Sequence, residues 1–246
     1  MQLESTIDLD DHPDSVEGAY EILRDIRKKE LKVVDDDFER RQKRTQSFHD
    51  YIQRQLDHPA QVLPELIQNA DDAVGKTDEP DNPRKARFEL HTGEDPFLLV
   101  ANTGPAVDAE DTRALTTIGD TTKRDADRKA TIGHKGRGFS AVLEITEQPY
   151  VFSTDVSFMF DRERSREHIA AVIETLDDWS MADIAGIPLM RLPFAPDHRP
   201  SRVKELLADG YETVFYFPLR EDAVKDVQRS LTELDEQTVL FLHNLK

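Results

Sequence analysis

Carboxylates and an amide recur at helical spacing between Glu65 and Ala73. On a helix that turns about 100° per residue, Glu65, Asn69 and Asp72 fall within a stripe about 60° wide. Magnesium takes oxygen ligands and keeps several waters, so the Asn69 side-chain carbonyl and the phosphates of a ligand could hold it. Glu65, one turn earlier, could take a proton from an attacking water. The alternative is a surface helix with a solvated acidic face.

A glycine-rich run from Gly133 to Gly138 precedes an apolar stretch that begins at Phe139. Its glycines let the backbone turn tightly and approach an anion, and a following helix N-terminus offers unpaired amides and partial positive charge. This pattern indicates phosphate binding. The spacing fits neither the P-loop nor the dinucleotide fingerprint, so both of those enzyme classes lose support. A purely structural turn is the alternative.

A third candidate site follows an apolar strand, where Asn102 and Gly104 stand in the run Asn-Thr-Gly-Pro. Asn102 could hydrogen-bond the edge of a purine, and Gly104 would let the ring come close. A plain turn explains the same residues.

In their order along the chain, these motifs resemble the GHKL nucleotide-binding fold, which includes DNA gyrase, the ninety-kilodalton heat-shock chaperone, sensor histidine kinases and MutL. The matching elements are Glu-x-x-x-Asn-x-x-Asp-Ala from Glu65, Asn-x-Gly from Asn102, Ile-Gly-Asp-Thr-Thr-Lys from Ile118, and Ile-Gly-His-Lys-Gly-Arg-Gly-Phe from Ile132. The resemblance is strongest to the sacsin and NO VEIN branch, and it covers roughly residues 60 to 220.

This resemblance implies a role for each matched residue. Glu65 would be the base that activates water, Asn69 would be the magnesium ligand, and Asp72 would support the nucleotide side of the helix. Asn102 stands where many relatives place an aspartate that reads the adenine amino group, and Gly104 follows in its family position. Thr122 and Lys123 would be lid residues near the phosphates, and Thr213 would lie behind the adenine. The phosphate loop would consist of Gly133, Lys135, Gly136 and Gly138.

The elements that position these residues follow from hydrophobic periodicity. A helix leads to Ala73, with a fresh start or a kink at Pro64, and the polar stretch from Asn102 to Arg137 is expected to form lids or binding loops. Strands are predicted over 86–91, 97–101, 150–154, 156–160 and 212–219. Helices are predicted over 139–145, 163–176 and 222–245. Helices followed by a sheet and more helices indicate an α+β, two-layer sandwich. The resemblance implies the GHKL (Bergerat) type, with a mixed, mostly antiparallel sheet covered by helices on one face.

Two parts are expected: an N-terminal helical arm over residues 1–57 and a GHKL domain over 58–246. The apolar run from Val239 to Leu245 ends without a polar tail or capping glycine, which favours the N-terminal part of a longer protein over a complete small one. The resemblance adds further domains of the same polypeptide and an ATP-dependent homodimer as expected partners.

Composition narrows the classes of partner. The chain has 246 residues, with 32 basic and 50 acidic side chains and a formal net charge of −18. Its field should repel nucleic acid and anionic membrane surfaces. Without cysteine it cannot form disulfides or thiolate sites. An acidic N-terminus and the lack of a long apolar run predict a cytoplasmic protein, whose acidity suits either a salt-rich cytoplasm or an ordinary acidic surface.

The sequence therefore predicts an ATP-binding, magnesium-dependent ATPase that drives a conformational or dimerisation cycle, with ATP and Mg²⁺ as cofactors. Chaperone-like remodelling and antiviral defence are both compatible with relatives. A nucleotide-gated binding module with little turnover is the alternative, against which the base at Glu65 argues. A histidine kinase with His49 or His58 as phosphoacceptor is disfavoured, because neither lies in a recognisable acceptor helix pair.

Overall fold

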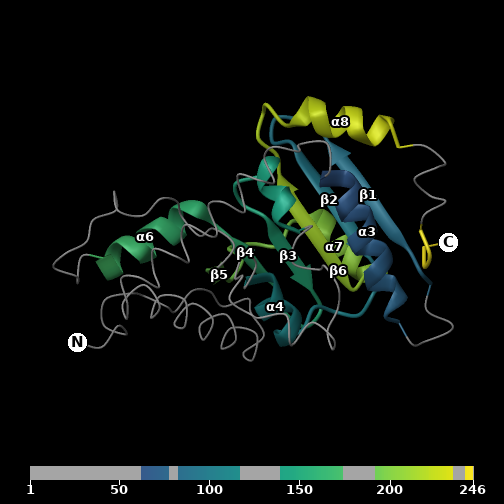
Figure 1. Ribbon diagram of the computed structural model, residues 1–246, viewed down its shortest axis with the longest axis horizontal. Coiled ribbons are helices and arrows are strands. Elements are labelled where there is room, and N and C mark those ends of the chain that lie inside the picture. The colour runs from purple at the N-terminus through teal and green to yellow at the C-terminus, as the bar shows by residue number, and fades with distance from the viewer. Residues whose placement is uncertain (1–61, 78–82, 117–138, 174–191, 235–241, 246) are drawn as a thin grey trace, which may run out of the picture.

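The computed structural model describes residues 62–77, 83–116, 139–173, 192–234 and 242–245 (Figure 1). The predicted N-terminal arm, the lid residues Thr122 and Lys123, and the glycine-rich run through Gly138 lie outside these ranges. Within them, no helix has the length and apolar character needed to cross a bilayer.

A six-stranded sheet forms the centre of the described fold, in the order β1-β2-β6-β3-β4-β5 (Figure 1). Every described strand pair is antiparallel. The strands are β1 (Ala86–His91), β2 (Phe97–Asn102), β3 (Tyr150–Ser153), β4 (Phe158–Phe160), β5 (Pro193–Phe194) and β6 (Thr213–Pro218). This open sheet with its helices confirms the predicted α+β sandwich.

Strand alternation divides the core between the two faces of the sheet. On one face, Leu98 and Val100 of β2 pack with α3 (Val62–Gly75), the short 3₁₀ helix η4 (Ser140–Glu144) and α8 (Val224–Thr232). On the other, Leu99 and Ala101 pack with α7 (Ser201–Ala208). Successive strand residues point to opposite faces, so one apolar strand serves both layers. The structure thus adds α7 on the face away from α3.

Helix α3 fits the sequence expectation for the first motif. Pro64 is its third residue, in the first turn, where an amide has no intrahelical acceptor to lose. The helix buries Val62, Leu63 and Leu66 in the core beneath the sheet. Pro64 therefore marks a fresh helix start, which the sequence offered as one of two solutions.

Three parts of the sequence prediction are corrected. Helix α4 (Ala109–Thr116) lies in the stretch expected to be loop, and the Asp108 carboxylate caps it by accepting the Asp111 N–H at 2.8 Å. Helix α7 lies between the predicted elements 163–176 and 212–219, where no helix was predicted. The C-terminal helix predicted to reach Leu245 ends at Thr232, and residues 242–245 are not helical. Helix α6 (Arg162–Ile173) agrees with its prediction apart from its ends.

Candidate nucleotide site

Three polar residues lie in one row at the end of three neighbouring strands. The register pairs Asn102 of β2 with Thr213 of β6, and Thr213 with Ser153 of β3. Paired residues across strands place their side chains on the same face of a sheet. Since Leu98 and Val100 of β2 face α3, the side chain of Asn102, two residues further along, faces α3 as well.

A cavity of about 90 Å³ opens between this row and α3. Its described lining comes from α3, β2 and the turn after it, α4, the start of η4 and β6, and consists of Asn69, Ala73, Asn102, Pro105, Val107, Asp111, Leu115, Phe139, Thr213 and Phe215. The structure thus brings together Asn69, Asn102 and Thr213, three residues singled out from the sequence. Glu65 and Asp72 are not among the lining residues; Glu65 is partly buried and Asp72 is exposed.

A turn fixes the orientation of the Asn102 side chain. Its Oδ1 accepts the backbone N–H of Gly104 at 3.0 Å, and its side chain is buried. The amide nitrogen is therefore the free donor of this side chain among the described residues, while Oδ1 keeps one lone pair.

Gly104 is required by close packing. A Cβ at Gly104 would lie 2.6 Å from both the backbone carbon and the backbone oxygen of Ala73 in α3. Backbone atoms cannot swing aside as a flexible side chain can. The turn after β2 and the helix α3 are thus pressed together at the cavity, which makes the separation of its two walls sensitive to this one residue.

Ser153 does not line the cavity but contacts two residues that do, Val107 and Thr213, and no sequence motif indicated it. Its Oγ accepts the Val107 N–H at 2.9 Å and donates to the Glu212 carbonyl at 2.9 Å. It also lies 3.4 Å from Oγ1 of Thr213. One hydroxyl therefore ties the loop after β2 to the start of β6, and both of these contribute residues to the cavity.

Aromatic rings form an apolar wall. The rings of Phe139 and Phe215 lie 5.4 Å apart between centroids, with an interplanar angle of 49°. Both line the cavity together with Leu115. Such a wall suits the flat face of an aromatic ligand, and the polar row at the strand ends could hydrogen-bond its edge.

Comparison with known proteins places the chain in a family. A model of the sacsin domain matches residues 41–246. The chain belongs to this family. It is also similar to Protein NO VEIN of Arabidopsis thaliana, with 27% identity over 187 residues, which cover 74% of this chain. The chain spans 6% of the length of that relative. The GHKL resemblance is consistent with a sacsin-type domain.

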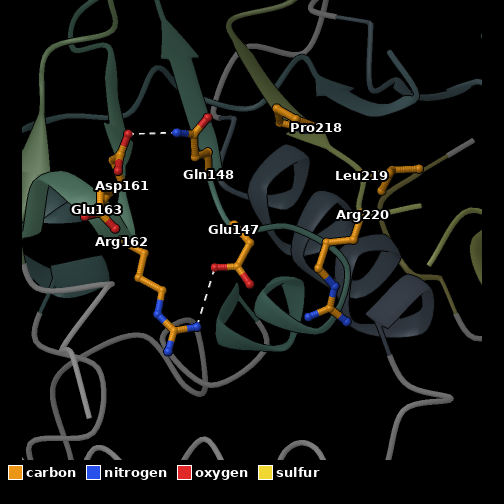
Figure 2. Close-up of a pocket in the computed structure, with 8 residues that line it drawn as sticks. All are labelled: Glu147, Gln148, Asp161, Arg162, Glu163, Pro218, Leu219 and Arg220. Carbon is orange, nitrogen blue, oxygen red and sulfur yellow. Dashed lines mark hydrogen bonds and ion pairs between the residues drawn. The ribbon is translucent and has the colours of Figure 1, made fainter. Parts of the chain in front are cut away.

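This sacsin domain has a second, larger hollow at the opposite end of the sheet, of about 350 Å³ (Figure 2). Its polar side chains largely pair with one another. Arg162 lies 3.6 Å from Glu147, and Gln148 donates to Asp161 at 2.8 Å. Groups already engaged with each other have less to offer a ligand, so the smaller cavity is the better candidate for a site.

The donor set of the smaller cavity in the sacsin domain fits magnesium. Within the described ranges, no group of three or more His, Asp or Glu side chains could hold a metal by itself. The cavity does offer two kinds of oxygen donor, the amide of Asn69 and the carboxylate of Asp111. Magnesium commonly binds to one or two protein oxygens, to ligand phosphates and to waters, so this set suits a metal that arrives with a phosphorylated ligand.

Proposed function

We propose that this sacsin domain binds ATP with magnesium in the cavity between α3 and the strand ends, and hydrolyses it slowly. The carrying observation is that Asn69, Asn102 and Thr213, from three separate elements, line one cavity beside Phe139 and Phe215. The adenine ring would lie against the aromatic wall, with its edge at Asn102 and Thr213.

The small size of the cavity supports a placement of only part of the ligand inside it. Pockets for whole ligands usually measure about 300–1,000 Å³, whereas this cavity measures about 90 Å³. It would therefore hold the base, and the triphosphate would extend beyond it. Lys123, Lys135 and the glycines of the 133–138 run would contact the phosphates, with Thr122 beside them.

Adenine selectivity would come from the oriented amide of Asn102. Its Oδ1 is engaged by Gly104, so the side chain presents chiefly its N–H donors. The N1 atom of adenine is an acceptor, whereas guanine carries a hydrogen at the same ring position. ATP with magnesium should therefore raise the melting temperature more than GTP does. Equal shifts would contradict the assignment of Asn102, and Asn69→Ala should remove the magnesium-dependent part.

Glu65 would supply the base for hydrolysis. It lies one turn before Asn69 on α3, on the same stripe of the helix. Glu65→Ala should lower turnover by roughly 10²–10⁴-fold and leave nucleotide binding largely intact. Glu65→Gln, which keeps the shape but cannot take a proton, is the matched control and should behave alike. Wild-type chain that binds ATP without turnover above background would favour the nucleotide-gated module.

The nucleotide would drive a conformational cycle. We propose that closure around ATP is passed to further domains of the same polypeptide or to a second copy of this domain. Light scattering with and without a non-hydrolysable ATP analogue tests the second copy. A mass that stays monomeric under saturating analogue would remove the homodimer from the proposal.

A further inference from the structure

A buried carboxylate on α3 holds a segment that is distant in sequence. Asp71 accepts three backbone N–H groups, from Leu245 at 2.7 Å, Asn244 at 2.8 Å and His243 at 3.0 Å. The Asn244 side-chain amide donates to it as well, at 3.2 Å. Successive backbone amides that converge on one carboxylate form an anion-binding nest, and hydrogen bonds to an ionised acceptor are the stronger kind. We call these four bonds the Asp71 clamp.

The hydrogen bonds of the Asp71 clamp stabilise the charged form of the carboxyl group. Burial raises the pKa of Asp71, but the backbone hydrogen bonds from Leu245, His243 and Asn244 outweigh it and hold the pKa below its ordinary value. All four groups of the clamp donate to the two oxygens of Asp71, so segment 243–245 binds the carboxylate as an anion.

Glycine at position 75 lets the segment lie close to the helix. A Cβ at Gly75 would lie 2.5 Å from Nδ2 of Asn244. Gly75 follows Asp71 by one helical turn, so both contacts are on the same side of α3. Figure 1 shows the short 242–245 segment beside the C-terminal half of α3.

The opposite side of α3 lines the nucleotide cavity. Asn69 precedes Asp71 by two residues and Ala73 follows it by two, which places both of them more than a quarter turn away from the clamp. Ala73 also presses against Gly104, the residue that orients Asn102. The last two turns of α3 thus lie between the cavity and segment 243–245, and a shift of these turns alters both contacts.

We propose that the Asp71 clamp couples nucleotide binding to segment 243–245, so that a bound nucleotide tightens the clamp and a formed clamp strengthens nucleotide binding. This inference rests on the proposed function, since it requires a nucleotide in the cavity. Either contact orders the end of α3, so the second contact to form loses less conformational entropy. This gives positive cooperativity between them. Coupling between two binding events is reciprocal, so the same factor should appear in both directions.

Hydrogen exchange of the 246-residue chain tests the coupling directly. A non-hydrolysable ATP analogue with magnesium should slow exchange of the His243, Asn244 and Leu245 amides by about fivefold or more. Asp71→Asn, which keeps the shape but replaces one acceptor oxygen with an amino group, should speed their exchange and abolish the nucleotide dependence. It should also weaken analogue binding by about the same factor. Asp209→Asn, an equal change of charge at the exposed C-cap residue that follows α7, should alter neither.

Gly75→Ala provides an independent variant. Alanine has a higher helix propensity than glycine, yet its methyl would displace the Asn244 side chain. We expect faster exchange at 243–245 in a variant that melts no lower than wild type, with an effect smaller than that of Asp71→Asn. This variant and the wild-type exchange decide the matter if Asp71→Asn fails to fold.

The outcomes separate the two proposals. Wild-type chain that binds the analogue while exchange at 243–245 stays unchanged would overturn the coupling and leave the ATP site standing. Asp71→Asn that folds and binds the analogue as tightly as Asp209→Asn would also overturn the coupling. Wild-type chain that binds no analogue at all would overturn the ATP site and the coupling together.

Discussion

At the scale of single residues, short-range turns decide what the cavity can recognise. Asn102 accepts from Gly104 two residues on, so a local turn sets which end of its amide is free. An aspartate at this position could only accept, whereas the amide both donates and accepts. The local sequence Asn-Thr-Gly predicts such a turn, because asparagine side chains commonly bond to the backbone two residues further on.

Residues whose partners are distant in sequence escaped prediction. Ser153 bonds to Val107 across 46 positions, and Asp71 bonds to His243 across 172. Neither residue stands in a spacing that indicates its role, since a serine at a strand end and an aspartate on a helix are both commonplace. Asp71 was next to the predicted stripe and the sequence favoured its exposed neighbour Asp72, because helical spacing does not show which contacts a later segment will make.

Glu144 should make stability depend on pH near neutrality. Burial raises the pKa of this carboxyl to about 7, against a weaker opposing effect of Arg220. Its Oε2 is buried without a hydrogen-bond partner among the described residues. Because the folded state holds the proton more tightly than the unfolded state, the stabilisation is present below the unfolded pKa, near pH 4.5, and is lost as pH rises through 7.

Glu144→Gln should remove this dependence. Between pH 5 and pH 8 the wild type should lose about 2 kcal/mol of unfolding free energy more than the variant loses. Urea unfolding of both proteins at the two pH values measures the difference, and other titrating groups cancel in the comparison. A gap between wild type and variant that is the same at pH 5 and pH 8 would show that folding does not raise the pKa of Glu144.

At the scale of elements, hydrophobic periodicity predicted what is locally encoded. Strand β1 has the predicted bounds, and β2 extends one residue beyond them. The predicted ends of α8 were wrong. The apolar run near Leu245 has helical spacing, but spacing does not show whether its backbone amides bond within a helix or to a distant residue. There, the amides of residues 243–245 bond to Asp71.

The packing of α3 on the turn after β2 yields a test at Gly104. Its substitution by alanine would place a methyl 2.6 Å from the Ala73 backbone, so α3 or the turn must move. We expect Gly104→Ala to cost about 1–3 kcal/mol of unfolding free energy and to weaken nucleotide binding. Gly93→Ala is the matched control, since a Cβ at Gly93 meets nothing within 4 Å. Equal melting temperatures for the two variants would contradict the close contact.

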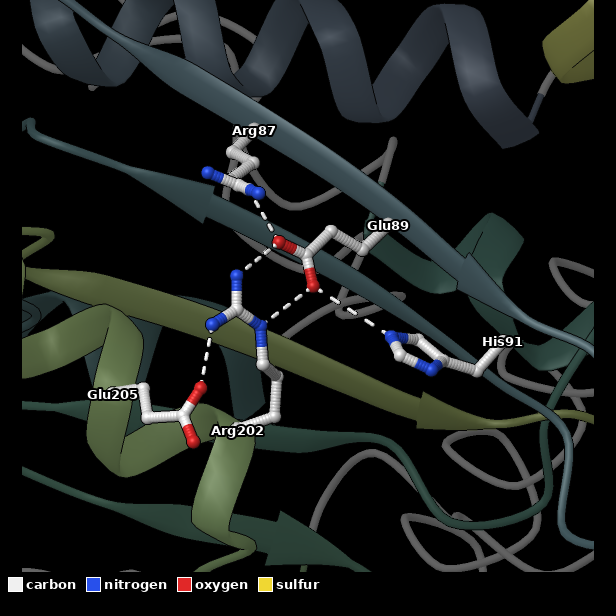
Figure 3. Close-up of polar contacts among 5 residues, drawn as sticks. All are labelled: Arg87, Glu89, His91, Arg202 and Glu205. Atoms are coloured by element: carbon white, nitrogen blue, oxygen red, sulfur yellow. Dashed lines mark hydrogen bonds and ion pairs between the residues drawn. The ribbon is translucent and has the colours of Figure 1, made fainter.

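At the scale of the whole molecule, an ion-pair network joins the edge of the sheet to the layer behind it (Figure 3). Glu89 of β1 accepts two bonds from Arg202 of α7, at 2.6 and 2.8 Å. Arg87 also donates to Glu89, and Arg202 also donates to Glu205. Strand β1 pairs only with β2 among the described strands. The network therefore fixes an edge strand that lacks a second neighbour.

The sequence could not place this network, because Glu89 and Arg202 are 113 positions apart and α7 was not predicted. The network forms because α7 packs on this face of the sheet. Val203 and Leu206 of α7 are buried there, and Arg202 beside them reaches β1. Fold class thus followed from the order of the elements, whereas the contacts between layers required the structure.

Glu89→Gln tests the strength of this connection. Hydrogen bonds from Arg202 lower the pKa of Glu89 to about 2, against an opposing effect of burial and with help from Arg87. Bonds to a charged group contribute about 1–3 kcal/mol, so the variant should lose that much unfolding free energy at pH 7.

A lowered pKa gives stability that is present above the unfolded pKa, near 4.5, and is lost as pH falls toward 2. The gap between wild type and variant should therefore persist from pH 7 to pH 5 and shrink below pH 4.5. Asp226→Asn, which breaks an exposed pair with Arg229, should cost under about 1 kcal/mol. Urea unfolding across this pH range decides, and a Glu89→Gln variant no less stable than Asp226→Asn would show that the sheet edge is held by packing alone.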